Sequence, residues 1–137
     1  MTMLVLDCSV TMSWLFREEF TPFSERILDE VDAGQAVQPI IWPLEVANVM
    51  LLAEGRGRIS QADSSRLLAL LAGLKVDVSP SSERQSFDDL IPLARETELT
   101  AHEAGYLELA GRLGVPLATL DRTLERAANQ VGVTVFS

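Results

Sequence analysis

Four acidic residues occupy positions from which they could do chemistry together. Asp7 ends the apolar run MLVLD, Asp121 ends PLATLD, Glu45 lies in WPLEVANVM, and Glu103 lies in LTAHEAGYLELAGR. The chain has only one cysteine and one histidine to accompany them. A ring of carboxylates without Cys or His ligands suits Mg²⁺ or Mn²⁺ rather than zinc. Because such ions promote phosphodiester hydrolysis, the acids predict a magnesium or manganese site acting on phosphodiesters.

Each acid also has a simpler role when it is considered alone. Thr100 and Glu103 have the S/T-x-x-E spacing of a capping box, and Asp121, between a strand and a helix, suits an N-cap. Glu45, expected in the first turn of its helix, would interact favourably with the helix dipole. Asp7 differs, because an unpaired carboxylate rising from a buried strand is costly and a bound cation would offset that cost. We expect metal-site roles because all four acids fall on one rim of the predicted sheet.

Three polar neighbours are candidates for orienting these carboxylates. Ser9 and Thr119 each lie two residues from an acid at a strand end, so their hydroxyls could hydrogen-bond a ligand carboxylate or a water molecule. Asn48 lies three residues after Glu45, on the same side of a helix, and could orient it. Cys8 and His102 are not expected to form a nucleophile pair, because strand alternation turns Cys8 away from the side of Asp7.

The elements that must position these residues alternate along the chain. Short apolar or β-branched runs predict five strands, at 3–7, 36–39, 75–79, 116–120 and 133–136. Segments of helical period predict helices at 21–34, 42–57, 60–74, 81–98, 100–113 and 121–132, with Pro92 expected to kink or divide its helix. An apolar stretch at 9–16 separates the first strand from the first of these helices. The alternation predicts an α/β fold of three layers, α/β/α, around a central, mainly parallel five-stranded sheet. We expect residues 1–137 to form a single domain, with ligands beyond the carboxyl ends of the strands.

Composition restricts the partners and the compartment. The net charge of −9 disfavours non-specific attraction to nucleic acid or to anionic membranes, so a polyanionic substrate needs local help from cations or arginines. No apolar run approaches the roughly 20 residues of a membrane span, and the first residues lack the pattern of a signal peptide. We therefore expect a cytoplasmic protein without a membrane partner. A single cysteine excludes an internal disulfide.

Three stretches resemble the acidic motifs of PIN-domain proteins, in particular the VapC-like toxins of bacterial and archaeal toxin–antitoxin pairs. They are VLDCSV, PLEVANVM and LTAHEAGYLELAGRLGVPLATLDRTLERAA. The resemblance implies an α/β/α nuclease fold, Mg²⁺- or Mn²⁺-dependent endoribonuclease activity on RNA, homodimerisation, and inhibition by a cognate VapB-like antitoxin. It assigns the catalytic and metal-binding roles to Asp7, Glu45, Glu103 and Asp121, and Asn48 matches the Asn that usually follows the second acid.

The chain departs from the family pattern at Glu103, where Asp is usual. Glu is longer by one carbon–carbon bond, about 1.5 Å, so its oxygen reaches the same point only if the side chain folds back or the metal shifts. The departure leaves a second hypothesis open. In that hypothesis the chain is a PIN-like domain with impaired catalysis that serves as an antitoxin- or protein-binding module.

Two further stretches suit the partners that the resemblance implies. The segment SWLFREEFTPF has more apolar side chains than one helix face easily buries, so part of it could receive an antitoxin segment. The candidate antitoxin contacts are Trp14, Phe16, Phe20 and Phe23. The segment EGRGRIS places Arg56 and Arg58 on a Gly-rich turn, where they are candidates for contact with RNA phosphates.

Overall fold

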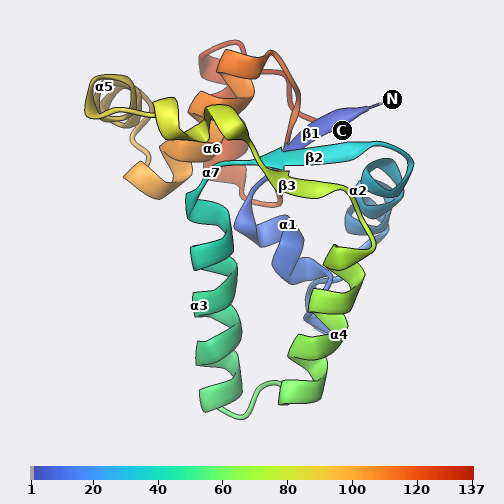
Figure 1. Cartoon of the computed structure of the whole chain (residues 1–137). Helices are drawn as coiled ribbons and strands as arrows, with labels where there is room; N and C mark the ends of the chain where they lie inside the picture. The colour runs from blue at the N-terminus through green and yellow to red at the C-terminus, as the bar shows by residue number, and fades with distance from the viewer. Residues whose placement is uncertain (1) are drawn as a thin grey trace.

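A four-stranded parallel sheet lies at the centre of the computed structural model, which describes residues 2–137 (Figure 1). The strands are β1 (Met3–Leu6), β2 (Gln35–Gln38), β3 (Val76–Val78) and β4 (Leu117–Ala118), in the order β3-β2-β1-β4. The central strand β1 changes partner along its length. Its first half pairs with β2, through Leu4 and Ala36, and its second half pairs with β4, through Leu6 and Ala118.

The fifth predicted strand, at 133–136, is not a strand in the structure. This segment forms one isolated parallel bridge, between Val135 and Leu117. Two backbone hydrogen bonds accompany the bridge, from Leu117 N to Thr134 O at 2.8 Å and from Phe136 N to Leu117 O at 2.9 Å. Because β4 is only two residues long, it offers too few backbone groups for a longer ladder. The prediction of five strands was therefore wrong by one.

Helices connect the strands. They are α1 (Cys8–Ser13), α2 (Pro22–Ala33), α3 (Ile41–Gly55), α4 (Gln61–Ala72), α5 (Phe87–Thr97), α6 (Ala101–Leu113) and α7 (Arg122–Gln130), with short 3-10 helices η1 (Arg17–Glu19) and η2 (Pro80–Arg84). The predicted helix 81–98 divides at Gln85, ahead of Pro92, because Ser86 caps α5 by accepting a hydrogen bond from Asp89 N. Within residues 2–137, no helix is both long and apolar enough to cross a membrane.

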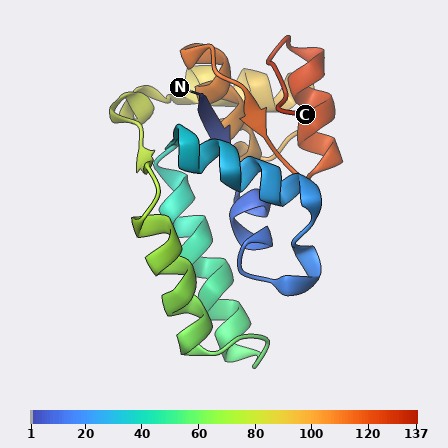
Figure 2. The same cartoon turned by 90° about the vertical axis from the view of Figure 1, so that its right-hand side faces the viewer.

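Strand alternation sends side chains to two separate apolar clusters, one on each face of the sheet. Leu4 and Leu6 pack with Ile27 and Val31 of α2 on one face. Val5 packs on the other face, in a cluster that includes residues of α3, α6 and α7. The helices thus cover both faces, and Figure 2 shows α2 on one side of the sheet and α6 on the other. The predicted three-layer α/β/α architecture is confirmed.

A buried glutamine holds β1 and β2 together at the end nearest Asp7. The Gln38 side chain donates from Nε2 to Leu6 O at 2.7 Å and accepts from Leu6 N at Oε1, at 2.8 Å. It therefore takes the place of the backbone ladder between the two strands, whose last direct pair is Leu4 with Ala36. The strands can separate at their carboxyl ends without leaving the polar groups of Leu6 unpaired.

We expect Gln38→Leu to destabilise the protein strongly. The substitution keeps a similar volume but leaves the buried N–H and C=O of Leu6 without partners, which should lower the free energy of unfolding by about 2–5 kcal/mol. Urea denaturation measures this loss. Gln61→Leu, at the exposed start of α4, is the control. Equal urea midpoints for the two variants would contradict the role assigned to Gln38.

Candidate functional site

The structure brings the four predicted acids together around one cavity of about 170 Å³. The cavity lies at the carboxyl ends of β1 and β4, where α1, α3, α6 and α7 meet. Its lining residues are Asp7, Cys8, Ser9, Glu45, Glu103, Tyr106, Asp121 and Leu124. The acids come from four different segments, so only the tertiary structure makes them neighbours.

Asp7 is the most buried of these acids, with 6% of its surface exposed. It follows β1 directly and caps α1 by accepting a hydrogen bond from Val10 N at 3.1 Å. Ser9 Oγ donates to its Oδ1 and Thr119 Oγ1 donates to its Oδ2, both at 2.5 Å. Burial nevertheless raises the pKa of Asp7 above its ordinary value, and the charge of Asp121 raises it further, against these hydrogen bonds.

The two hydroxyls also tie Asp7 to the loop that carries Asp121. Ser9 Oγ accepts a hydrogen bond from Leu120 N at 3.1 Å, and Thr119 Oγ1 accepts one from Asp121 N at 2.9 Å. Each hydroxyl therefore bridges a carboxylate oxygen and a backbone N–H. Both positions were predicted from the sequence as neighbours of ligand carboxylates. These hydrogen bonds fix the residues after β1 relative to the residues after β4.

Glu45 lies in the second turn of α3 rather than in the first turn, where the sequence analysis placed it. The helix begins at Ile41, two residues before Pro43. Its first turn tolerates the proline, because the backbone N–H groups of a first turn have no partner within the helix and a missing one costs little. The favourable interaction of Glu45 with the helix dipole is correspondingly weaker. Its Oε1 accepts a hydrogen bond of 2.6 Å from the hydroxyl of Tyr106 on α6. Asn48, the expected partner, is exposed on the next turn.

Tyr106 is the site residue that the sequence analysis missed. Its side chain belongs to the apolar core, yet its hydroxyl reaches the cavity. The available signal was the spacing from Glu103, because residues three apart share one face of a helix. Burial, with the hydrogen bond to Glu45, raises the pKa of Tyr106 well above its ordinary value, so the phenol is a donor at physiological pH.

Glu103 and Asp121 both cap helices in the structure. Glu103 Oε1 accepts hydrogen bonds from Thr100 N and Thr100 Oγ1, both at 2.9 Å, which completes the capping box at the start of α6. Asp121 Oδ1 accepts a hydrogen bond from Thr123 N at 2.8 Å at the start of α7. The capping roles considered from sequence are therefore present, on side chains that also line the cavity.

The donor set around the cavity fits a hard cation in its chemistry. Carboxylates and hydroxyls are the ligands that Mg²⁺ and Mn²⁺ prefer, and one of the carboxylates is buried beside like charge. Among residues 2–137, however, no three Asp, Glu, Cys or His side chains stand close enough to form a ready ligand set. The caps explain this separation, because Glu103 and Asp121 are turned toward the backbone of their own helices. Metal binding would require these side chains to turn inward.

Cys8 lines the cavity as well, contrary to the expectation that it points away from Asp7. Strand alternation does not apply to it, because β1 ends at Leu6 and Cys8 is the first residue of α1. Burial, together with the charges of Glu45 and Asp7, raises the pKa of the thiol to about 12. A protonated thiol is a poor nucleophile. His102 is exposed at the start of α6 and does not line this cavity.

The two candidate RNA-contacting arginines lie at the far end of α3 from the cavity. Arg56 follows the last turn of the helix, about 16 Å along the axis from Glu45. Arg58 is engaged within the chain: it pairs with Glu18 and Glu19 and lies over the ring of Phe16, 3.6 Å from its centroid. The structure therefore gives Arg58 a tethering role between η1 and the turn that joins α3 to α4.

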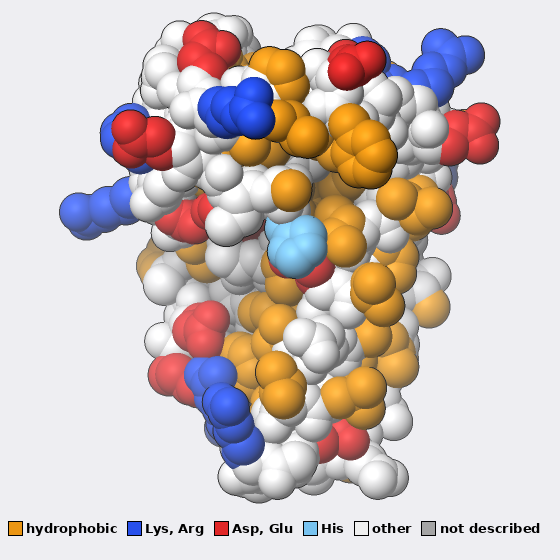
Figure 3. All heavy atoms as spheres, turned by 90° about the vertical axis from the view of Figure 1, so that its left-hand side faces the viewer, with side chains coloured by type: hydrophobic (Ala, Val, Ile, Leu, Met, Phe, Trp, Pro, Cys, Tyr) orange, Lys and Arg blue, Asp and Glu red, His pale blue; other side chains and the backbone are white. Residues whose placement is uncertain are grey.

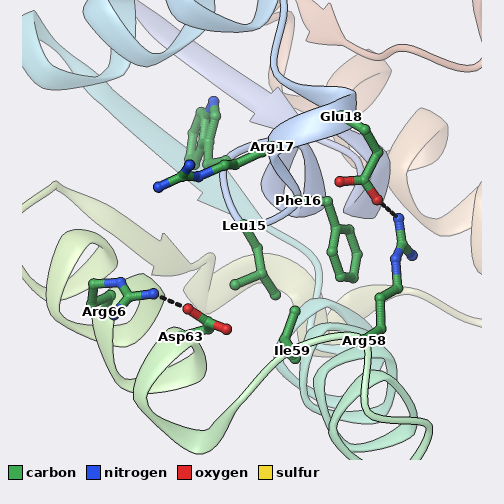
Figure 4. Close-up of a pocket in the computed structure, with 9 residues that line it drawn as sticks. Leu15, Phe16, Arg17, Glu18, Arg58, Ile59, Asp63 and Arg66 are labelled. Atoms are coloured by element: carbon green, nitrogen blue, oxygen red, sulfur yellow. Dashed lines mark hydrogen bonds and ion pairs between the residues drawn. The ribbon is translucent and has the colours of Figure 1, made fainter.

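The four candidate antitoxin-contacting aromatics lie in three different places. Trp14 and Phe16 line a second cavity, of about 380 Å³, between the segment after α1 and helix α4 (Figure 4). Phe20 is exposed but does not line that cavity. Phe23 packs against Phe136, with ring centroids 6.1 Å apart. The structure thus keeps two of the four together on one surface hollow.

We expect Asp7→Asn to stabilise the protein in the absence of divalent cations. Because burial raises the pKa of Asp7, ionisation costs more in the folded than in the unfolded state, and the stability falls as pH rises above the ordinary value of 3.8. The uncharged amide avoids this loss. In EDTA at pH 7, the variant should melt a few degrees above the wild type.

The difference should disappear near pH 3, where Asp7 is protonated in both states. Asp32→Asn, on the exposed side of α2, controls for the loss of one negative charge. A melting temperature of Asp7→Asn at or below that of the wild type at pH 7 would show that the hydrogen bonds outweigh burial.

Two comparisons with known proteins agree with the fold and the motifs, although the chain matches no protein-family model. The chain is 27% identical over 121 residues to Ribonuclease VapC3 of Pyrobaculum aerophilum, an alignment that covers 88% of this chain and 91% of the relative. The crystal structure of PAE2754 from the same organism has a TM-score of 0.67 at 22% identity, covering 92% of this chain and 86% of that one. The resemblance inferred from the motifs is confirmed: the chain is similar to a VapC ribonuclease and has a PIN-like fold.

Proposed function

We propose that the chain is a Mg²⁺- or Mn²⁺-dependent endoribonuclease and the toxin of a type II toxin–antitoxin pair. The observation that carries the proposal is the buried carboxylate of Asp7, which opens into one cavity with Glu45, Glu103 and Asp121. The similarity to a protein named as a ribonuclease supports the same reaction class. Asp7, Glu45, Glu103 and Asp121 would hold the cation. When bound, it would supply Lewis-acid activation of the phosphodiester and of the attacking water.

The residues around the cavity prepare the carboxylates for that role. Ser9 and Thr119 fix both oxygens of Asp7, so this carboxylate has one orientation before any ligand arrives. Its raised pKa indicates a charge that the protein alone does not neutralise. A divalent cation would offset this charge and would also attract RNA phosphate to a chain with a net charge of −9. Arg56, exposed beyond α3, remains the candidate for a more distant phosphate contact.

We also propose that the hollow beside α4 receives the antitoxin. Its lining includes four apolar side chains, those of Trp14, Leu15, Phe16 and Ile59. Figure 4 shows Leu15 and Phe16 opposite Ile59. The other lining residues are charged, and they include the ion pairs of Arg58 with Glu18 and of Arg66 with Asp63. A hollow lined by both apolar and charged side chains is suited to an amphipathic segment of a VapB-like partner.

Homodimerisation, the remaining part of the proposal, is supported by an apolar face. Ile40, Leu44 and Leu51 recur at helical spacing, and the two leucines are 68% and 66% exposed. Figure 3 shows hydrophobic side chains gathered along the side of the molecule where α3 and α5 lie. Phe87 and Ile91 of α5 add to the exposed apolar surface. A contiguous face of this kind is typical of a protein interface.

RNA cleavage tests the activity directly. Purified protein incubated with structured RNA should cleave it in the presence of Mn²⁺ and stop when EDTA is added. Asp7→Asn should slow cleavage by on the order of 100-fold or more, because it removes the fixed carboxylate of the cation site. Thermal unfolding supplies a second measurement, since Mn²⁺ should raise the melting temperature of the wild type but not that of the variant.

The alternative function predicts a different result from the same preparation. The capping hydrogen bonds of Glu103, which hold its carboxylate at Thr100, favour a PIN-like domain with impaired catalysis that binds an antitoxin or another protein. In that case no RNA is cleaved with either cation, while a VapB-like protein still binds tightly. This outcome would overturn the nuclease proposal and retain the binding module.

The oligomeric state tests the apolar face. Light scattering of the wild type should give the mass of a dimer, and the double variant Leu44→Asp/Leu51→Asp should give the 15.0 kDa monomer, because burying two carboxylates at an interface is costly. Leu68→Asp, at an exposed position of α4, is the control and should remain dimeric. A monomeric wild type, or a double variant that stays dimeric, would contradict this assignment.

A further inference from the structure

Tyr106 on α6 and Glu45 on α3 are joined by a hydrogen bond between their side chains. Within residues 2–137, it is the one side-chain hydrogen bond between these two helices at the cavity. The tyrosine is 2% exposed, and its ring packs in the apolar core. The core therefore determines where the hydroxyl lies. At 2.6 Å from Glu45 Oε1, this hydroxyl makes a short, charge-assisted hydrogen bond of the strong kind.

This hydrogen bond restricts a side chain that would otherwise be mobile. Glu45 is only partly buried, and ordering a free glutamate side chain costs rotamer entropy. The other acids are held differently: Asp7 by two hydroxyls and a backbone N–H, Glu103 and Asp121 by caps. Glu45 lies beyond the first turn of its helix, so no free backbone N–H is available to cap.

We propose that Tyr106 is a positioning residue, whose buried hydroxyl holds one oxygen of Glu45 and directs the other toward the cavity shared with Asp7. The inference rests on the proposed function, in which this cavity takes a divalent cation. It deepens that function, because Tyr106 touches the carboxylate but not the cation. The phenol donates to Oε1 and leaves Oε2 available as a ligand atom.

The arrangement also relates two of the acids to each other. Tyr106 lies three residues after Glu103, so both occupy one face of α6. The same helix that carries Glu103 thereby sets the position of Glu45, which comes from α3. Partners that hydrogen-bond a ligand carboxylate in this way typically change metal affinity by about 10–100-fold when they are removed.

Calorimetric titration with Mn²⁺ tests the proposal. Tyr106→Phe keeps the ring in the core and removes only the hydroxyl, and we expect Mn²⁺ to bind about 10-fold more weakly or worse. Thr97→Val is the matched control. It removes a buried hydroxyl that donates to Leu93 O at 2.7 Å within α5, away from the cavity. This control should bind Mn²⁺ as the wild type does.

A second measurement separates positioning from a loss of folding. Because the defect of Tyr106→Phe lies in binding, its rate of RNA cleavage should recover toward that of the wild type as the Mn²⁺ concentration is raised. Equal Mn²⁺ affinities for Tyr106→Phe and Thr97→Val would overturn the proposal, as would a cleavage defect that no Mn²⁺ concentration relieves. A wild type that neither binds Mn²⁺ nor cleaves RNA would instead overturn the proposed function on which the inference rests.

Discussion

The arrangement of the site depends on one electrostatic constraint, the carboxylate of Asp7 at the buried end of the central strand. A buried carboxylate without hydrogen-bond partners would destabilise the fold. The chain supplies three hydrogen bonds to Asp7, from Ser9, Val10 and Thr119. Burial still dominates, so the carboxylate stays harder to ionise than in water. In the proposed function, a divalent cation would supply the positive charge that offsets this cost.

The residues that hydrogen-bond the Asp7 carboxylate also position the surrounding backbone. Ser9 and Thr119 also accept hydrogen bonds from the chain after β4, which brings Asp121 beside the end of β1. On the opposite edge of β1, Gln38 replaces the missing ladder and lets β2 diverge. The cavity therefore lies where β1 exchanges one partner strand for the other, the place where parallel sheets commonly bind ligands.

Glu103 and Asp121 each cap a helix and also line the cavity. From the sequence alone, either role was open for these two acids. The spacing of Thr100 and Glu103 predicted a capping box, which the structure contains, and the same carboxylate lines the cavity. Prediction succeeded where the deciding interactions are local, as in the caps of Glu103 and Asp121. It failed at Cys8, because the strand ended one residue before Asp7, and at 133–136, because the partner edge was too short.

By itself, the sequence determined the alternation of strands and helices, the acids at their ends, and the motifs that resemble VapC-like proteins, because these features depend on neighbouring residues. Only the tertiary structure decided that Tyr106, rather than Asn48, holds Glu45. It also decided that Arg58 tethers η1 instead of remaining free on a loop. Both outcomes depend on contacts between segments about 40 or more residues apart, whose partners are chosen by core packing and charge, and no local pattern encodes that choice.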